Sequence, residues 1–415
     1  MLVDASPVLP LVLTVLSLLS ALLLAVAFVL TGYLGILAAL ARRRPPPKPP
    51  APTTHFSFVV PAHNEEQGIA ATVASLLAVD WPQDRFAVFV VADNCTDATA
   101  ASARAAGAVV LVRENADLRG KGYALEHGFA HVLQNTETDA VVVVDADTIV
   151  DRNLLSAFAA RIHAGALALQ AEYGVRNVDA SWRTELMALA LAMFHTLRSL
   201  ARERLGVSVG LRGNGMCFTR ACLLRFPHRA YGLVEDAEYG VALGQGGVRV
   251  FGVDDAHVWG EMVSSSRASE SQRRRWEEGR ALLRRSKTMP LLRQGLRNKD
   301  GICLDLAFDL LVPPLSTVFA ITALGVLVDV VRLVLGGGLL LGGLWLVPIT
   351  CLGLYLVRGI QLSGLGWRAP LVLGRAPLYL VWKLWLKLKG GQEKAWVRTA
   401  RESQSSDGPQ RNDSA

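Results

Sequence analysis

Long apolar runs alternate with polar stretches and divide the chain into membrane and water-soluble parts. Residues 11–41 carry no charged side chain, a run long enough for a helix to cross a bilayer. We therefore predict an N-terminal transmembrane helix within residues 1–44. A cleaved signal peptide is the competing interpretation, but the apolar run is too long and no basic segment precedes it. The positive-inside rule places the N-terminus outside and the next domain in the cytoplasm, because four basic residues follow the run: Arg42, Arg43, Arg44 and Lys48.

A different pattern follows the Pro-rich segment 45–54, which is expected to act as a stiff spacer. From residue 55 onward, short runs rich in β-branched residues alternate with Ala-rich segments that are typical of helices. This alternation predicts βαβ units and a parallel sheet, hence an α/β domain. The strands are expected at 56–61, 86–92, 108–112 and 140–144.

Polar side chains follow three of these strands. His63, Asn64 and Glu65 come after the first strand, and Asp93 comes after the second. The fourth strand leads into Asp145 and Asp147. The carboxyl edge of an α/β sheet is where ligands bind, so these residues predict a nucleotide site. Two carboxylates with one spacer residue suit Mg²⁺ or Mn²⁺, although a strand that runs into a polar turn has the same pattern.

Neither a GxGxxG loop nor a P-loop opens a helix here, which disfavours dinucleotide binding and P-loop NTP hydrolysis. Lys121 precedes an Ala-rich helix and could reach a phosphate or a base, or be a solvated lysine at a helix start. Residues 182–205 form an amphipathic pattern, compatible with a helix on a membrane surface or on the domain itself. The Gly-containing loop 212–216 could let a ligand approach closely, or be a plain turn.

Two further polar clusters lie downstream. Glu235 and Asp236 open a helical segment, where the helix dipole alone would stabilise them; the functional alternative is a general base. The segment 272–276, Gln-Arg-Arg-Arg-Trp, lies on a basic helical stretch that could face anionic lipid headgroups. The indole of Trp276 is in addition a good platform for a sugar ring or a cation.

Composition narrows the class of protein. The chain is 51% hydrophobic and 19% charged, with a mean hydropathy of +0.32, which fits a membrane-attached catalytic domain. The net charge of +7 comes from basic residues at the edges of the apolar stretches, so it indicates membrane orientation and not nucleic-acid binding. Five cysteines without CxxC spacing favour a reducing compartment over a zinc or disulfide framework.

The C-terminal region is predicted to return to the membrane. Residues 310–328 and 333–357 are uncharged, so two spanning helices are expected within 305–357, joined outside near 336–338. Residues 370–389 have the pattern of an amphipathic helix in the interface, and 390–415 that of a polar cytoplasmic tail. The sequence thus predicts a multi-pass protein of the plasma membrane, with three spans and a cytoplasmic C-terminus.

Taken in order, these motifs resemble those of the family 2 glycosyltransferases. The resemblance is strongest to the membrane-embedded branch of cellulose, chitin, hyaluronan and poly-N-acetylglucosamine synthases, and it covers residues 55–290. It rests on four motifs: Asp93 in VADNCTD, the DxD of Asp145 and Asp147, the pair Glu235 and Asp236, and the QxxRW of 272–276.

The resemblance implies a GT-A (Rossmann-like) catalytic domain, a nucleotide-diphosphate sugar donor, expected to be a UDP-sugar, and inversion at the anomeric carbon. It implies that Asp236 is the base and that Asp147, with Asp145, holds Mg²⁺ or Mn²⁺. Donor-binding residues carried over from the family are Pro61, Asn64, Glu65, Asp93, Lys121 and Asp145. Residues for the acceptor and the diphosphate are Glu235, Gln272, Arg275 and Trp276.

The expected reaction is sugar transfer to a growing polysaccharide, with single transfer to a membrane lipid as the alternative. Val234 stands where many relatives have Thr. The C-terminal membrane part is shorter than in the large channel-forming synthases, so export of a polymer could require a partner.

Two other classes of protein are less compatible with these motifs. A sugar-phosphate nucleotidyltransferase would need neither membrane helices nor QxxRW. A non-enzymatic scaffold would be expected to have lost its carboxylates.

Overall fold

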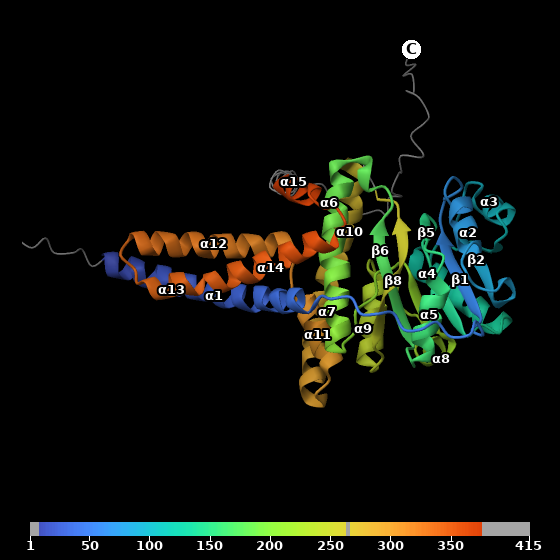
Figure 1. The fold of residues 1–415 in the computed structure, drawn as a ribbon, viewed down its shortest axis with the longest axis horizontal. Helices are drawn as coiled ribbons and strands as arrows, with labels where there is room; N and C mark the ends of the chain where they lie inside the picture. Colours follow the sequence, from blue (N-terminus) through green and yellow to red (C-terminus); the bar gives the residue numbers. More distant parts are fainter. Residues whose placement is uncertain (1–7, 263–265, 376–415) are drawn as a thin grey trace, which may run out of the picture.

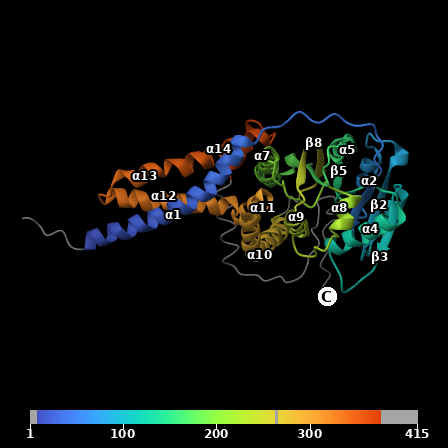
Figure 2. The ribbon, with the colours of Figure 1, turned by 90° about the horizontal axis from the view of Figure 1, so that it is seen from below.

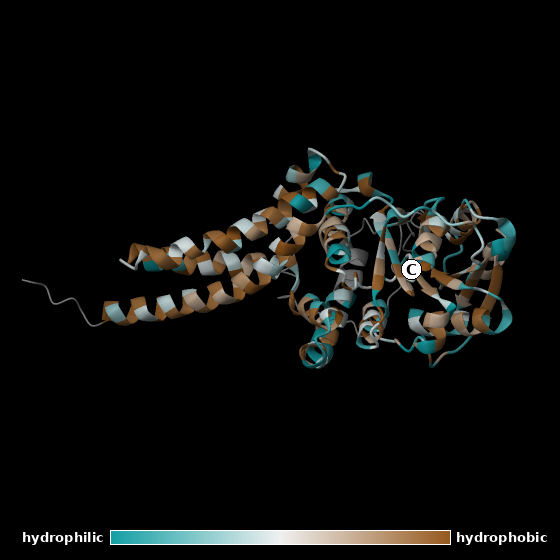
Figure 3. Cartoon of the chain, turned by 60° about the horizontal axis from the view of Figure 1, so that its bottom comes forward, coloured by the Kyte–Doolittle hydropathy of each residue, from teal (hydrophilic) through white to brown (hydrophobic). Residues whose placement is uncertain are grey.

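The computed structural model describes residues 8–262 and 266–375, with side chains described outside 266–274. An elongated arm of membrane-type helices projects from a broader α/β domain, the predicted catalytic domain (Figure 1). Apolar residues dominate the ribbon of this arm, whereas the catalytic domain mixes both kinds (Figure 3). Residues 41–55 form neither helix nor strand and run along the catalytic domain from the arm to the first strand (Figure 2).

The catalytic domain is built on an eight-stranded sheet of order β3-β2-β1-β4-β7-β6-β8-β5. The four predicted strands are confirmed to within one residue at each end, and they lie side by side and parallel: β1 (Phe56–Ala62), β2 (Phe86–Asp93), β3 (Val109–Arg113) and β4 (Ala140–Val143). Four strands were not predicted: β5 (Thr148–Val150), β6 (Ala168–Val175), β7 (Met216–Thr219) and β8 (Val250–Gly260).

The predicted parallel arrangement holds for β1 to β4, but the whole sheet is mixed, because β7 lies antiparallel to both β4 and β6, and β5 lies antiparallel to β8. The βαβ pattern in the sequence predicted only the four parallel strands β1 to β4, which form one half of the sheet. The four-residue β7 is too short to show a period, so the reversal leaves no signal in the hydrophobic pattern.

Both faces of the sheet are covered, which explains the uninterrupted apolar runs. Along β4, Val142 packs into one core cluster and Val141 and Val143 into the other, because successive side chains point to opposite faces. One cluster is covered by α2 (Ile69–Leu77), α3 (Thr99–Ala105) and α5 (Leu154–His163). The opposite cluster is covered by α4 (Lys121–Asn135), α8 (Arg220–Arg225) and α9 (Glu235–Gln245). Two 3₁₀ turns connect elements at Gln83–Arg85 and Val178–Ala180.

Three helices in the described part of the chain are long and apolar enough to cross a membrane, the number that the sequence predicts. They are α1 (Val8–Leu40), α12 (Leu315–Val334) and the pair α13 (Leu339–Leu344) with α14 (Leu346–Leu362). Helix α1 packs against both α12 and α14. The turn between the second and third helices falls at 335–338, where it was expected.

The bounds of the predicted C-terminal hairpin are corrected by the structure. Residues 305–311 belong to a separate helix, α11 (Gly301–Leu311), which packs on α9 and α10 and carries Asp305 and Asp309. Helix α12 continues through Asp329, because this carboxylate pairs with Arg332 at 2.8 Å and the two charges neutralise each other. Helix α15 (Arg368–Gly374) overlaps the start of the segment 370–389 predicted as an interfacial helix; residues 376–415 lie outside the described part.

A layer of helices lies between the arm and the sheet. The amphipathic segment predicted at 182–205 is one continuous helical run, α6 (Trp182–Leu191), a π-helical turn η3 (Ala192–Leu197) and α7 (Arg198–Leu205). It packs on α1 and α14 on one side and on β6 and β8 on the other. With α10 (Ser266–Asn298) and α11, it crosses the end of the arm at a steep angle (Figure 1).

Buried charges join this layer to the arm. The carboxylate of Asp309 on α11 lies 2.8 Å from the guanidinium groups of both Arg198 and Arg202. Arg202 also pairs with Asp305 at 3.0 Å and donates to the Tyr33 hydroxyl of α1 at 2.8 Å. Burial by itself would raise the pKa of Asp309, but Arg202, Arg280 and Arg198 outweigh it and hold this pKa well below its ordinary value.

We predict that Asp309→Asn destabilises the protein, because two buried guanidinium groups lose their shared counter-charge. Removing one partner of a buried ion pair costs about 3 kcal/mol or more. Thermal unfolding of the detergent-solubilised protein should show a clearly lowered midpoint. Asp84→Asn is the matched control, since Asp84 makes only an exposed pair with Arg85 at 3.7 Å. Equal midpoints for the two variants would contradict this role of Asp309.

Candidate active site

The DxD carboxylates lie at the carboxyl edge of β4, half-buried, as predicted. Asp145 accepts a charge-assisted hydrogen bond from the ammonium group of Lys121, the first residue of α4. The same ammonium group donates to the Gly213 carbonyl at 2.7 Å and lies 3.8 Å from a carboxylate oxygen of Glu235. Burial would lower the pKa of Lys121, but the charges of Asp145 and Glu235 outweigh it and raise that pKa. Lys121 is therefore a fixed positive charge at the centre of the site.

Asn214 positions the DxD segment, and sequence reasoning did not single it out. Its fully buried amide accepts a hydrogen bond from the Asp145 backbone N–H at 3.1 Å and donates to the Thr148 hydroxyl at 2.8 Å. The Thr148 hydroxyl in turn donates to Asp147 at 3.2 Å. Gln170 of β6 donates to the Asn214 carbonyl at 2.7 Å. The loop 212–216 is thus held against the DxD segment by hydrogen bonds, and its glycines were the only sequence signal of this contact.

Glu235 and Asp236 begin α9 and face this loop, so the predicted acidic pair reaches the DxD region. A Cβ atom at Gly213, whose φ is +81°, would lie 3.3 Å from Asp236 Oδ2 and 3.5 Å from Lys121 Nζ. Burial raises the pKa of both acids, and Lys121 acts in the opposite direction. Among the described residues, no ion pair within 4 Å involves the Asp236 carboxylate. A half-buried carboxylate with a raised pKa is suited to accept a proton.

The carboxyl end of β2 carries an ion pair. Asp93 closes β2 and forms an ion pair of 2.5 Å with Arg113, the residue beside it in the β2–β3 register. Arg113 was not predicted as a site residue. The sequence could have indicated it, because it directly follows the predicted strand 108–112. Asn64, with φ of +57°, accepts a hydrogen bond from the Thr96 backbone at 2.7 Å and so ties the first strand's loop to the second's.

The other predicted donor residues of this region lie close by. The Glu65 backbone N–H donates to the Thr99 hydroxyl at 2.7 Å. Pro61 is inside β1, paired with Val91 in the sheet, so it shapes the strand end. The residues predicted to bind the donor thus fall into two adjacent groups along one sheet edge, one around Asp93 and one around Asp145.

The QxxRW segment lies on α10, beside the acidic pair. Trp276 packs against a cluster that includes Val234 and Val241, the residues that flank the acidic turn. Gly279 allows this approach, because a Cβ there would come within 2.8 Å of the Val234 side chain. Arg275 and Trp276 are partly buried, whereas the side chain of Gln272 lies outside the described part. The structure therefore brings Trp276 next to the start of α9.

The DxD carboxylates offer the hard oxygen ligands that Mg²⁺ and Mn²⁺ prefer. No group of three or more His, Cys, Asp or Glu side chains suited to a metal occurs among the described residues. Asp145 and Asp147 supply two half-buried carboxylates at the carboxyl edge of β4, where Asp145 also accepts a hydrogen bond from Lys121 and Asp147 one from Thr148. Two hard oxygen ligands with the remaining positions left to water and phosphate are what Mg²⁺ takes in nucleotide sites.

Comparison with known proteins decides the family. The family model described as "Glycosyltransferase like family 2" matches residues 51–279, more than half of the chain. The chain belongs to this family. It is 29% identical over 273 residues to the β-monoglucosyldiacylglycerol synthase of Synechocystis, covering 60% of this chain and 54% of that protein. It is 34% identical over 110 residues to cellulose synthase 2 of Novacetimonas hansenii, covering 26% of this chain and 7% of that protein.

This family 2 glycosyltransferase thus spans about half or less of the length of these curated relatives. Among solved structures it resembles the mannosyltransferase PcManGT of Pyrobaculum calidifontis, determined with GDP-Man and Mn²⁺. The TM-score is 0.53 at 18% identity, covering 83% of this chain and 97% of that one. The predicted GT-A fold with flanking membrane helices is confirmed.

Gly213 in the loop 212–216 and Gly210 just before it allow the role of this loop to be tested. Gly210 and Gly213 have φ of +80° and +81°, so alanine strains both backbones alike, by about 1 kcal/mol. We predict that Gly213→Ala lowers the turnover number at least tenfold, because its Cβ crowds Asp236 and Lys121. Gly210→Ala, whose Cβ meets only the Arg212 side chain at 3.7 Å, should keep near-normal turnover. A similar loss in both variants would mean that backbone strain alone matters.

Proposed function

We propose that this glycosyltransferase is an inverting, metal-dependent enzyme that moves a sugar from a nucleotide-diphosphate donor, expected to be a UDP-sugar, to an acceptor hydroxyl at the membrane. The observation that carries the proposal is the approach of Asp236 to the Lys121–Asp145 pair across Gly213. A proton acceptor beside a positive charge and a metal-type carboxylate pair suits displacement of a diphosphate by a hydroxyl group.

Each residue has a role in this proposal. Asp93, Asn64 and Glu65 lie along the sheet edge where the nucleotide would bind, while Asp147, with Asp145, would hold Mg²⁺ or Mn²⁺. The cation, when bound, would neutralise the charge that develops on the leaving diphosphate. Lys121 contributes a second, permanent positive charge on the same side.

The bond changes follow from this placement. The acceptor oxygen forms a bond to the anomeric carbon as the bond from that carbon to the diphosphate oxygen breaks. Asp236 takes the hydroxyl proton. Attack from the face opposite the leaving group inverts the anomeric configuration. The raised pKa of Asp236 supports this role, because a base is most effective when its pKa approaches the working pH.

We propose a growing saccharide as the acceptor, bound by Trp276 with Arg275, Gln272 and Glu235. Stacking a pyranose on an indole buries apolar C–H surface without requiring one fixed hydrogen-bond pattern, so a chain can shift by one unit between additions. The position of Trp276 beside the start of α9 supports this role. Export of the product would then require a partner or further membrane helices.

Single transfer to a membrane lipid is the second candidate. It is favoured by an arm of three membrane-type helices and by the similarity to a glycolipid synthase over 60% of the chain. In both cases the catalytic domain would face the cytoplasm, because basic residues follow the first span.

The first test separates the metal from the base. We predict that Asp147→Asn and Asp236→Asn each lower turnover by about 10²- to 10⁴-fold. Metal-dependent UDP binding, measured by titration calorimetry, should weaken in Asp147→Asn and stay near normal in Asp236→Asn. Wild-type turnover in either variant would refute the assignment of that residue.

The second test identifies the acceptor. Mass spectrometry of the wild-type product should show a ladder of hexose or N-acetylhexosamine units. Trp276→Ala should shorten this ladder and reduce nucleotide release in the presence of acceptor, with donor affinity changed far less. Trp367→Ala is the matched control, because Trp367 is exposed on the surface. A product with one sugar on a lipid, even with excess donor, would select the second candidate.

A further inference from the structure

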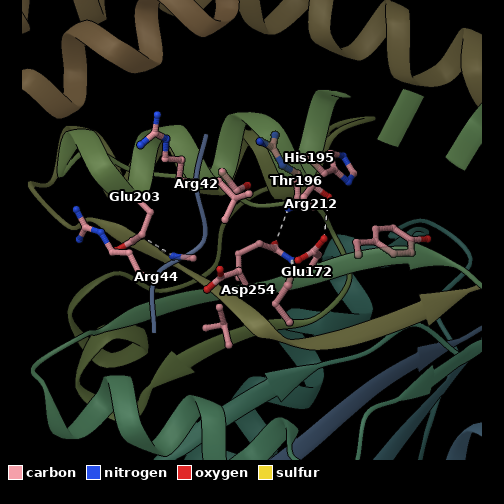
Figure 4. A pocket seen from close by; sticks show the side chains of 15 residues that line it. Arg42, Arg44, Glu172, His195, Thr196, Glu203, Arg212 and Asp254 are labelled. Atoms are coloured by element: carbon pink, nitrogen blue, oxygen red, sulfur yellow. Dashed lines mark hydrogen bonds between the residues drawn. The ribbon is translucent and has the colours of Figure 1, made fainter. Parts of the chain in front are cut away.

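A pocket lies between the helical layer and the sheet, outside the proposed catalytic site. Its cavity volume is about 40 Å³. Helices η3 and α7 form one wall, β6 and β8 the opposite wall, and the segment after α1 runs along it with Arg42 and Arg44 (Figure 4). Arg212, the first residue of the loop 212–216, lines the same pocket. Neither Glu235 nor Asp236 is among its lining residues.

The acidic side chains of the pocket are already neutralised by cations outside its lining. Glu172 pairs with Arg43 at 2.8 Å and accepts a hydrogen bond from Thr196 at 3.0 Å. Glu203 pairs with Arg249 at 2.7 Å. Asp254 lies 3.8 Å from the Arg43 guanidinium and 3.7 Å from that of Arg161.

The basic side chains of the pocket lack such partners. Arg42 and Arg44 are exposed, and neither forms an ion pair or a hydrogen bond with a described residue. The Nε atom of Arg212 is buried without a hydrogen-bond partner, while another of its nitrogens donates to the Val209 carbonyl at 3.0 Å. The Nδ1 atom of His195 is also buried without a partner. The pocket therefore presents three guanidinium groups with unused donors and no free counter-charge among the described acids.

The position of the pocket identifies the kind of anion. Helix α1 ends at Leu40, and the Ala41 carbonyl accepts a hydrogen bond of 2.6 Å from Arg358 at the end of the third span. Arg42 and Arg44 thus emerge where two membrane helices reach the cytoplasmic surface, the level of lipid phosphates. Guanidinium groups bind phosphate oxygens in pairs, which favours phosphate among anions.

We propose that this pocket binds the phosphate of an anionic membrane lipid, and that the lipid holds the catalytic domain at the membrane surface. The site is distinct from the acceptor site and does not depend on the acceptor's identity. Arg42 and Arg44 would contact the phosphate at the mouth, and Arg212 would meet it from within.

The experiment measures lipid binding to the full chain in detergent by native mass spectrometry, with phosphatidylglycerol as the probe and phosphatidylcholine for comparison. We expect tight binding of one phosphatidylglycerol in preference to phosphatidylcholine. The double variant Arg42→Gln/Arg44→Gln should bind about thirtyfold more weakly, since each basic residue near a lipid surface contributes about fivefold. Its thermal midpoint should stay unchanged, because neither side chain is bonded within the protein.

Lys48→Gln is the control, because it removes the same charge from the same connecting segment without touching the pocket. Its lipid binding should equal that of the wild type. An equal loss in Lys48→Gln, no preference for phosphatidylglycerol, or unchanged binding in the double variant would overturn the proposal. Added inorganic phosphate that displaces the lipid at equal concentration would also overturn it, in favour of a site for free phosphate.

Discussion

The ammonium group of Lys121 is the charge on which the proposed catalytic site depends. Asp145, Glu235 and Asp236 come from two distant parts of the chain, and their carboxylates would repel one another strongly in a buried site. Lys121 bonds directly to Asp145 and lies 3.8 Å from Glu235, so one cation offsets two acids. It also anchors the Gly213 carbonyl, which brings the start of α9 against the end of β4. Without this counter-charge, the acidic groups could not share one edge of the sheet.

A second set of buried charges connects that site to the membrane. Asp309 joins Arg198 and Arg202 of the helical layer, and Arg202 reaches Tyr33 of the first span. Arg280, from the helix that carries Trp276, approaches the same carboxylate at 3.4 Å. The helices of the layer are therefore fixed by electrostatics to one another and to the arm, and helix α10 is held where Trp276 meets the acidic turn.

Features that leave a pattern in neighbouring residues could be predicted from the sequence, whereas features that depend on tertiary contacts could not. The four parallel strands were predicted to within a residue, because an apolar run bounded by polar residues is a local pattern. Asp145 and Asp236 were singled out at a strand end and at a helix start, and the roles that the resemblance gives them stay predictions. Asn214 was missed, because its role depends on a backbone N–H that only the fold brings near. The reversal at β7 was missed for the same reason, since pairing direction is set by tertiary contacts.

In the membrane part, the number of spans was predicted but their bounds were not. Two spans were predicted within 305–357, yet residues 305–311, with Asp305 and Asp309, belong to α11, which packs on α9 and α10. Helix α12 also extends beyond Asp329, because Arg332 neutralises it within the same helix. A count of charged residues along the sequence does not show which charges are paired. The paired Asp329 was therefore taken as the end of the span, although it lies inside α12.

The proposed mechanism has one direct consequence for its product. If Asp236 deprotonates an acceptor that attacks opposite the diphosphate, each transfer must invert the anomeric carbon. Proton NMR of the linkage formed from an α-linked nucleotide-sugar measures this without assuming the acceptor. The mechanism predicts a β-linkage in the first product formed. An α-linkage would contradict it, because retention requires a different arrangement of the groups around the anomeric carbon.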